Sequence, residues 1–160
     1  MGASDLPWRR SCWGDCRRIA FCSRRVWEAG DVVDLDLEMN PELIEANPLV
    51  EETLGQVAVK RGPIVYCLES VDLPGDVKLS DVSLTQTSNL RARYDQRLLG
   101  GSVVIEGKAR ARISDAWQGE LYREKQPDKL KSINLQLIPY SLWANRGRSE
   151  MSVWLPLGGS

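Results

Sequence analysis

The chain has 160 residues, of which 42% are hydrophobic, and this is enough to bury the core of one domain. Its 21 basic and 22 acidic residues give a net charge of −1, so we expect neither nucleic acid nor an anionic membrane as a partner. Histidine is absent, which excludes Ser-His-Asp and Cys-His catalytic triads, imidazole general bases and histidine-containing zinc sites within this chain.

Residues 1–23 differ in composition from the rest of the chain. They mix Arg, Cys and Trp without a helical or strand period, which predicts a divergent or poorly ordered segment. Cys12, Cys16 and Cys22 lie four and six residues apart but lack the paired spacing of a zinc site, so we assign no metal and leave their disulfide or metal state open. The segment also lacks the apolar core of a signal peptide, and no run in the chain approaches the roughly 20 apolar residues of a membrane span, so we expect a cytoplasmic protein.

Residues 24–40 predict a hairpin that turns at Ala29-Gly30-Asp31. In its second strand, one side is apolar and the other acidic, as in a half-buried strand: Val33, Leu35 and Leu37 against Asp34, Asp36 and Glu38. The spacing of Asp34 and Asp36 suits a catalytic carboxylate pair, and Asp31 could join them around Ca²⁺. Alternating acids are, however, the ordinary way to solvate the outer face of a strand, so we assign no catalytic residue and no metal ligand.

Residues 41–53 are predicted to be a connector, with a turn at Asn47-Pro48. Two strands then flank a tight turn at Arg61–Pro63, where Gly62 accepts unusual backbone angles and Pro63 cannot donate a ladder hydrogen bond. The run from Ile64 to Leu68 is apolar at every position, which predicts a strand covered on both faces, with Cys67 as a buried hydrophobe.

Short strands are predicted after a turn at Leu73–Asp76, with Asp95–Gly101 as a link rich in turn residues. They lie at 82–87, 102–106, 109–114, 121–123 and 132–138, and Gly107 is predicted to turn a hairpin between the second and the third. Alternation predicts an apolar face opposite a solvated basic face: Ala109, Ala111 and Ile113 against Lys108, Arg110 and Arg112. Frequent turns without an amphipathic helix predict an all-β fold, an antiparallel β-sandwich of jelly-roll type.

The stretch 139–157 carries both a candidate site and the predicted last strand. Met151, Val153 and Leu155 alternate with polar or aromatic neighbours, so we expect them to close the core. Aromatic rings beside loops, with an amide or guanidinium nearby, are typical of carbohydrate sites, and the candidates are Trp117, Tyr140, Trp143, Asn145 and Arg146, with Tyr122 nearby. The more ordinary role for such rings is structural, with Tyr140 and Trp143 buried at the end of the sandwich or against a neighbouring domain.

Several segments resemble the C-terminal region of glycoside hydrolase family 127, the β-L-arabinofuranosidase family. They are WEAGDVVDLDLEM, EANPLVEE, GQVAVKRGPIVYCLE, LLGGSVVIEG and IPYSLWANRGRSEMSVWLP, and together they span about residues 24–157. The resemblance implies that residues 24–40 end a middle sandwich domain, that 41–157 form the C-terminal sandwich and that 158–160 are a tail. It also implies that the nucleophilic cysteine, the zinc site and the acid/base glutamate belong to a helical barrel absent from this chain, so we expect no cofactor here.

The first hypothesis for function is therefore a non-catalytic C-terminal β-sandwich module that serves domain packing or oligomerisation, including formation of a homodimer. An alternative is a carbohydrate-binding module that holds polysaccharide through Trp117 or Trp143. A second alternative is a small stand-alone glycoside hydrolase that uses carboxylates or a cysteine-bound metal. Binding lost in Trp143→Ala would favour the module that holds sugar, and hydrolysis lost in Asp34→Asn or Cys16→Ser would favour the enzyme.

Overall fold

The computed structural model describes residues 26, 28–34, 37, 39–86, 88–113, 121–125 and 127–158. The chain divides into two compact units, Met1–Leu37 and Glu38–Ser160. Residues 1–23, with Cys12, Cys16 and Cys22, lie outside the described part, as do Asp36 and Trp117. No helix in the part of the chain that the structure describes is both long and apolar enough to cross a membrane.

The first unit contains the turn that the sequence predicts. The Asp31 amide donates to the Glu28 carbonyl at 3.1 Å, and the Glu28 amide donates back to Asp31 Oδ2 at 3.0 Å. The predicted half-buried strand is wrong for the described residues after this turn, because none of them has strand geometry and Val33 and Leu37 are 67% and 64% exposed. Apolar side chains without a surface to cover them gain nothing from a regular strand.

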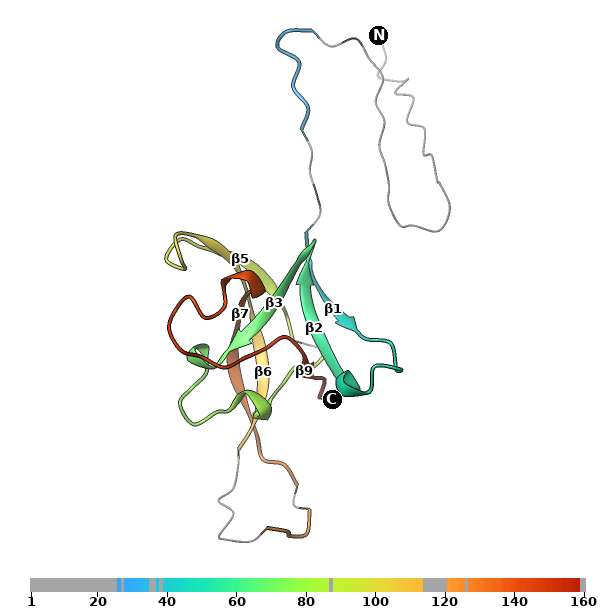
Figure 1. Cartoon of the computed structure of the whole chain (residues 1–160), viewed down its shortest axis with the longest axis vertical. Helices are drawn as coiled ribbons and strands as arrows, with labels where there is room; N and C mark the ends of the chain where they lie inside the picture. The colour runs from blue at the N-terminus through green and yellow to red at the C-terminus, as the bar shows by residue number, and fades with distance from the viewer. Residues whose placement is uncertain are drawn as a thin grey trace. The chain divides into compact units, whose positions relative to one another are not determined.

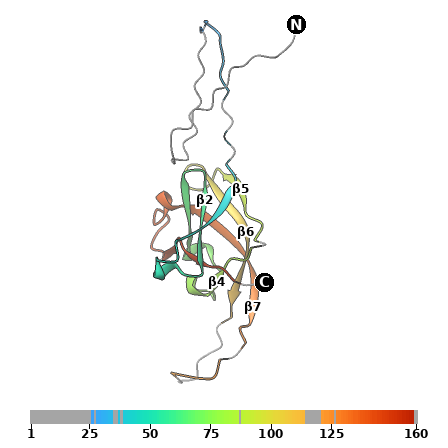
Figure 2. The same ribbon diagram turned by 90° about the vertical axis from the view of Figure 1, so that its right-hand side faces the viewer.

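The second unit is an antiparallel β-sandwich, as the sequence predicts (Figures 1 and 2). Among its described residues, nine strands form one curled sheet in the order β1-β2-β3-β7-β6-β4, with β5 on β6, β8 on β3 and β9 on β2. Their bounds are β1 Pro41–Glu45, β2 Gln56–Arg61, β3 Ile64–Glu69, β4 Val82–Ser83, β5 Arg91–Asp95, β6 Ser102–Arg112, β7 Leu130–Pro139, β8 Met151–Ser152 and β9 Leu155–Pro156. Four single turns of 3-10 helix connect them: η1 Glu51–Thr53, η2 Ser70–Asp72, η3 Leu79–Asp81 and η4 Tyr140–Leu142. Jelly-roll connectivity stays a prediction.

The first three strands lie side by side (Figure 1). The prediction of a connector over 41–53 is wrong in its first part, because β1 pairs along its whole length with β2. Pro41 is the first residue of β1, a position at which a strand accepts proline. The turn between β2 and β3 is confirmed, with Gly62 at φ +56°. The prediction that β3 is covered on both faces holds only from Tyr66 to Leu68, since Ile64 and Val65 are 38% and 42% exposed.

The hairpin predicted at Gly107 is wrong. β6 runs unbroken through this glycine and pairs with β7 from Ile105–Leu137 to Arg112–Leu130. A Cβ atom at Gly107 would lie 2.8 Å from Leu90 Cδ2 and 3.3 Å from the Asn89 carbonyl oxygen, so the glycine gives room to a crossing segment. The predicted strand at 121–123 is also not formed, and the one predicted at 82–87 is reduced to β4. No strand was predicted where β5 lies.

Two groups of buried side chains hold the sandwich together. The larger group lies inside the curled sheet and includes Tyr66, Leu68, Ile105, Leu137 and Leu155. The smaller group joins Cys67, Leu98, Val104 and Ile138, and the partly buried Leu142, Met151 and Val153 pack against it. The predicted last strand is thus broken into β8 and β9. Leu155 belongs to the larger group, whereas Met151 and Val153 pack against the smaller one.

Candidate functional site

A buried carboxylate lies where β3 ends. Glu69 pairs with Met151 of β8, directly precedes η2, and has no exposed surface. A charge removed from water is stable only if hydrogen bonds and an opposite charge replace the water. The residues around Glu69 must therefore supply the hydrogen bonds and the positive charge that this carboxylate needs.

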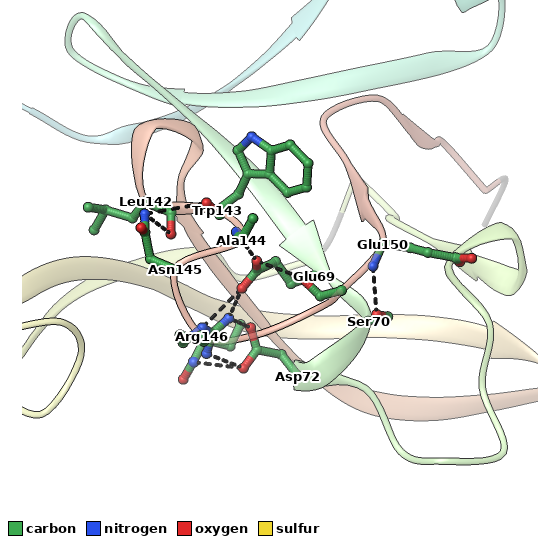
Figure 3. A network of polar contacts seen from close by, with 11 residues as sticks. Glu69, Ser70, Asp72, Leu142, Trp143, Ala144, Asn145, Arg146 and Glu150 are labelled. Atoms are coloured by element: carbon green, nitrogen blue, oxygen red, sulfur yellow. Dashed lines mark hydrogen bonds and ion pairs between the residues drawn. The ribbon is translucent and has the colours of Figure 1, made fainter.

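Arg146 joins Glu69 to a second carboxylate, Asp72 (Figure 3). Its Nε atom donates to Glu69 Oε2 at 3.0 Å, and its Nη2 atom contacts both carboxylates. Its Nη1 atom donates to Asp72 Oδ1 at 2.9 Å, and Gln136 Nε2 donates to the same oxygen at 3.3 Å. The Ala144 amide and the Ser149 hydroxyl each donate to Glu69 Oε1 at 2.9 Å. We call these residues the Glu69 network.

The Glu69 network shifts the pKa values of Glu69 and Arg146 and of the neighbouring Cys67. Burial alone would raise the pKa of Glu69, but hydrogen bonds from the Ala144 amide, Arg146 and Ser149 hold this pKa below its ordinary value. Hydrogen bonds to Asp72 and Glu69 raise the pKa of Arg146. Burial, together with the negative charge of Glu69, raises the pKa of the Cys67 thiol to about 11. At neutral pH Glu69 is ionised and Cys67 is a thiol.

The loop from Trp143 to Glu150 is held along its length. Ala144 has φ +62° and Gly147 has φ +111°, so two sharp changes of direction are built into the backbone. Asn145 Nδ2 donates to the carbonyls of Leu142 and Trp143 at 3.2 and 3.4 Å. At the far end, Ser70 and Glu150 exchange two hydrogen bonds, one from the Ser70 amide at 2.9 Å and one to the Ser70 hydroxyl at 3.1 Å.

This loop surrounds an open hollow of about 700 Å³. The indole of Trp143 points away from Arg146 and is 37% exposed (Figure 3). The residues that line the hollow come from the start of η2 and from the loop: Ser70, Trp143, Ala144, Gly147, Arg148, Ser149 and Glu150. We call it the Trp143 hollow.

The structure separates the residues that the sequence predicts for sugar contact. Trp143 lines the hollow, but Asn145 bonds to carbonyls of its own loop at the surface, and Arg146 binds the carboxylates of Glu69 and Asp72. Tyr140 is 46% exposed on η4 and does not line the hollow, and Tyr122 is 91% exposed elsewhere. Sequence reasoning missed Arg148 and Glu150, although both stand in the same polar loop, and it gave no sign of Glu69, which ends an apolar strand.

The other candidate groups show no assembled site. Within the described ranges, no three His, Cys, Asp or Glu side chains lie grouped as they would around a metal ion. In the predicted basic face, Lys108 donates to Asn134 Oδ1 at 2.5 Å and Arg112 pairs with Asp81 at 3.0 Å. These two cations are therefore used in contacts on the sheet surface.

Three comparisons with known proteins agree. The family model described as the glycoside hydrolase family 127 C-terminal domain matches residues 41–156. A non-reducing end β-L-arabinofuranosidase of Bifidobacterium longum is 36% identical over 135 residues, which are 81% of this chain and 20% of that protein. The chain thus spans about a fifth of the length of this curated relative.

Solved structures give the same result. A GH127 β-L-arabinofuranosidase from Geobacillus stearothermophilus T6 is 41% identical with a TM-score of 0.69, over 75% of this chain and 18% of that one. A structure described as a glycoside hydrolase is 40% identical with a TM-score of 0.77, over 90% of this chain and 24% of that one. The chain belongs to glycoside hydrolase family 127, and the part that matches is the family's C-terminal domain.

Proposed function

We propose that this chain is a non-catalytic C-terminal module of a β-L-arabinofuranosidase-type glycoside hydrolase, and that it serves packing of the rest of such an enzyme or its self-association. The observation that carries the proposal is the match of residues 41–156 to a C-terminal domain. This chain covers only 18% and 24% of two similar solved chains, so it matches less than a quarter of each. A module of this size is one part of such a protein.

The chemistry of the buried carboxylates supports a role without catalysis. A glycosidase general acid needs a raised pKa, so that the carboxyl carries a proton at the working pH. The pKa of Glu69 is lowered instead, and both Glu69 and Asp72 are bound by the same guanidinium. Both carboxylates stabilise a loop, and the lowered pKa of Glu69 is the opposite of what a general acid requires.

Exposed apolar side chains on the first strands support the packing role. Leu43 and Ile44 of β1 are 37% and 36% exposed, and Ile64 and Val65 of β3 are 38% and 42% exposed. Neighbouring residues of a strand point to opposite faces, so Leu43 and Ile64 share one face of the sheet, and Ile44 and Val65 share the other. Exposed apolar surface in a folded domain commonly marks a contact with another domain or another copy, and such a contact on either face would bury one of these pairs.

The test compares the isolated chain with a chimera. The purified 160-residue chain is expected to leave p-nitrophenyl β-L-arabinofuranoside uncleaved. Residues 41–156, placed in the Bifidobacterium relative in exchange for its matching segment, are expected to restore the folding and hydrolysis that the relative loses when that segment is deleted. Hydrolysis that stays with the isolated chain through purification and disappears in Asp34→Asn would contradict the proposal. A chimera as inactive as the deletion would contradict it as well.

A further inference from the structure

Three side chains at the Trp143 hollow are not used by the fold. Arg148 and Glu150 are exposed, and neither side chain has an ion pair or hydrogen bond to any residue that the structure describes. The indole N–H of Trp143 is likewise without an acceptor among the described residues. The same loop is otherwise held by hydrogen bonds at nearly every polar position, so these free groups stand out.

We infer that the Trp143 hollow binds a neutral oligosaccharide. A sugar ring presents a face of C–H groups that stacks on an indole, and its hydroxyls both donate and accept hydrogen bonds. Trp143 offers the apolar face, Arg148 offers donors and Glu150 offers acceptors, all on one hollow. The opposite charges of Arg148 and Glu150 cancel, and this favours a neutral ligand over an acidic one.

The size and openness of the hollow fit such a ligand. Its volume of about 700 Å³ lies inside the range of roughly 300–1,000 Å³ that is typical of small-molecule sites. An open site lets a chain of sugars extend beyond the residues that hold it.

The Glu69 network makes the site rigid before any ligand arrives. Arg146 and the Ala144 amide anchor the loop on a carboxylate with no exposed surface. A loop that is already ordered has less conformational entropy to lose on binding, so more of the contact energy appears as affinity. Asn145 and Arg146, which the sequence predicts as sugar contacts, are positioning residues in this arrangement.

The inference goes beyond the packing role, and its test is independent of it. The intact 160-residue chain, labelled with ¹⁵N, is titrated with α-1,5-arabinotriose, xylotriose and cellotriose, and with the acidic trigalacturonate. The indole N–H signal of Trp143 is assigned by its absence in Trp143→Ala. We expect at least one neutral trisaccharide to shift this signal in a saturable way at millimolar concentrations, and trigalacturonate to bind more weakly.

Variants separate a sugar site from a general surface effect. Trp143→Ala is expected to abolish binding, and Arg148→Ala and Glu150→Gln are each expected to weaken it at least fivefold. Tyr122→Ala removes an aromatic ring that is 91% exposed but does not line the hollow, and it is expected to leave binding unchanged. Spectra of ¹⁵N-labelled Arg148→Ala and Glu150→Gln that stay like those of the wild type would show that a loss of binding is not caused by unfolding.

Four results would overturn the inference. They are no saturable shift with any neutral trisaccharide, binding that survives in Trp143→Ala, tighter binding of trigalacturonate, and a Trp143 signal that moves with protein concentration instead of sugar. The last result would assign the hollow to self-association. None of them bears on whether the chimera hydrolyses arabinofuranoside, so each proposal can fail without the other.

Discussion

At Glu69, a carboxylate without exposed surface accepts hydrogen bonds from the Ala144 amide, the Ser149 hydroxyl and the Arg146 guanidinium. These donors lie on a loop that follows β7, and Arg146 is separated from Glu69 by 77 residues. The loop conformation thus depends on a charge from a strand far away in the chain. Removing that charge should loosen the loop and destabilise the domain.

We predict that Glu69→Gln lowers the free energy of unfolding by about 3 kcal/mol at pH 7, because it leaves the Arg146 guanidinium partly buried against one carboxylate fewer. The pKa of Glu69 is depressed in the folded state, so its stabilisation is complete above the ordinary glutamate pKa of about 4.3 and is lost as the pH falls through the depressed value. The difference between wild type and Glu69→Gln should therefore be constant above about pH 5 and narrow below about pH 4. Urea unfolding over this pH range measures it.

The control for this prediction is Glu106→Gln. Glu106 also pairs with an arginine, Arg93, but the two side chains are 43% and 45% exposed. An exposed pair contributes little to stability, so this variant should unfold almost as wild type does at every pH. Equal losses from Glu69→Gln and Glu106→Gln would contradict the special role of the buried site.

The sequence identified the Trp143 loop but not what each of its residues does. Trp143, Asn145 and Arg146 were predicted as sugar contacts beside a loop, and all three lie on the loop that follows η4. Which polar residue faces outward depends on the partner that the fold brings to it, and Glu69 and Asp72 lie more than 70 residues away. No local spacing carries that information.

At the scale of elements, β6 shows why a glycine can be misread. The alternation that predicted an apolar face is correct for Ala109 and Ala111, which are buried, but wrong for Ile113, which lies beyond the end of β6 and is 45% exposed. Gly107 was predicted to be a turn, yet β6 passes straight through it with β5 and β4 paired to its two halves. The segment that joins β4 to β5 crosses at Gly107, and only a residue without a side chain lets it approach.

Gly107→Val tests this explanation. The added methyl groups would meet Leu90 and the Asn89 carbonyl, so we expect a loss of about 1–3 kcal/mol in the free energy of unfolding, as for other overpacked sites. Gly75→Val is the matched control, because nothing lies within 4 Å of a Cβ atom there, and it should change stability by less than about 0.5 kcal/mol. Thermal and urea unfolding of the two variants compare them. Equal effects would mean that Gly107 is not a crossing point.

At the scale of the whole molecule, the two ends of the sheet are brought together. β9 pairs with β2, which lies next to the edge strand β1, and Leu157 forms a bridge with Leu84 just after β4 at the other edge. The last described strand and the residue after it thus link the two sides of the sheet. Short strands and frequent turns predicted the sandwich. The closure could not be predicted, because β4, β8 and β9 have two residues each and carry no detectable period. The sheet order is set by these pairings between distant segments.

The described core lies entirely between Val57 and Leu155, which makes the extent of the folding unit testable. We predict that a truncated chain of residues 39–158 unfolds in one cooperative step, with a free energy within about 0.5 kcal/mol of the full chain. A chain cut after Ser152 is the contrasting case. It loses Leu155, which is 1% exposed, and the pairing of β9 with β2, so we expect no cooperative transition. Circular dichroism and urea unfolding measure both. If the 39–158 chain lost most of its stability, residues before Met39 would have to contribute to the fold, and the sandwich could not be treated as the complete folding unit.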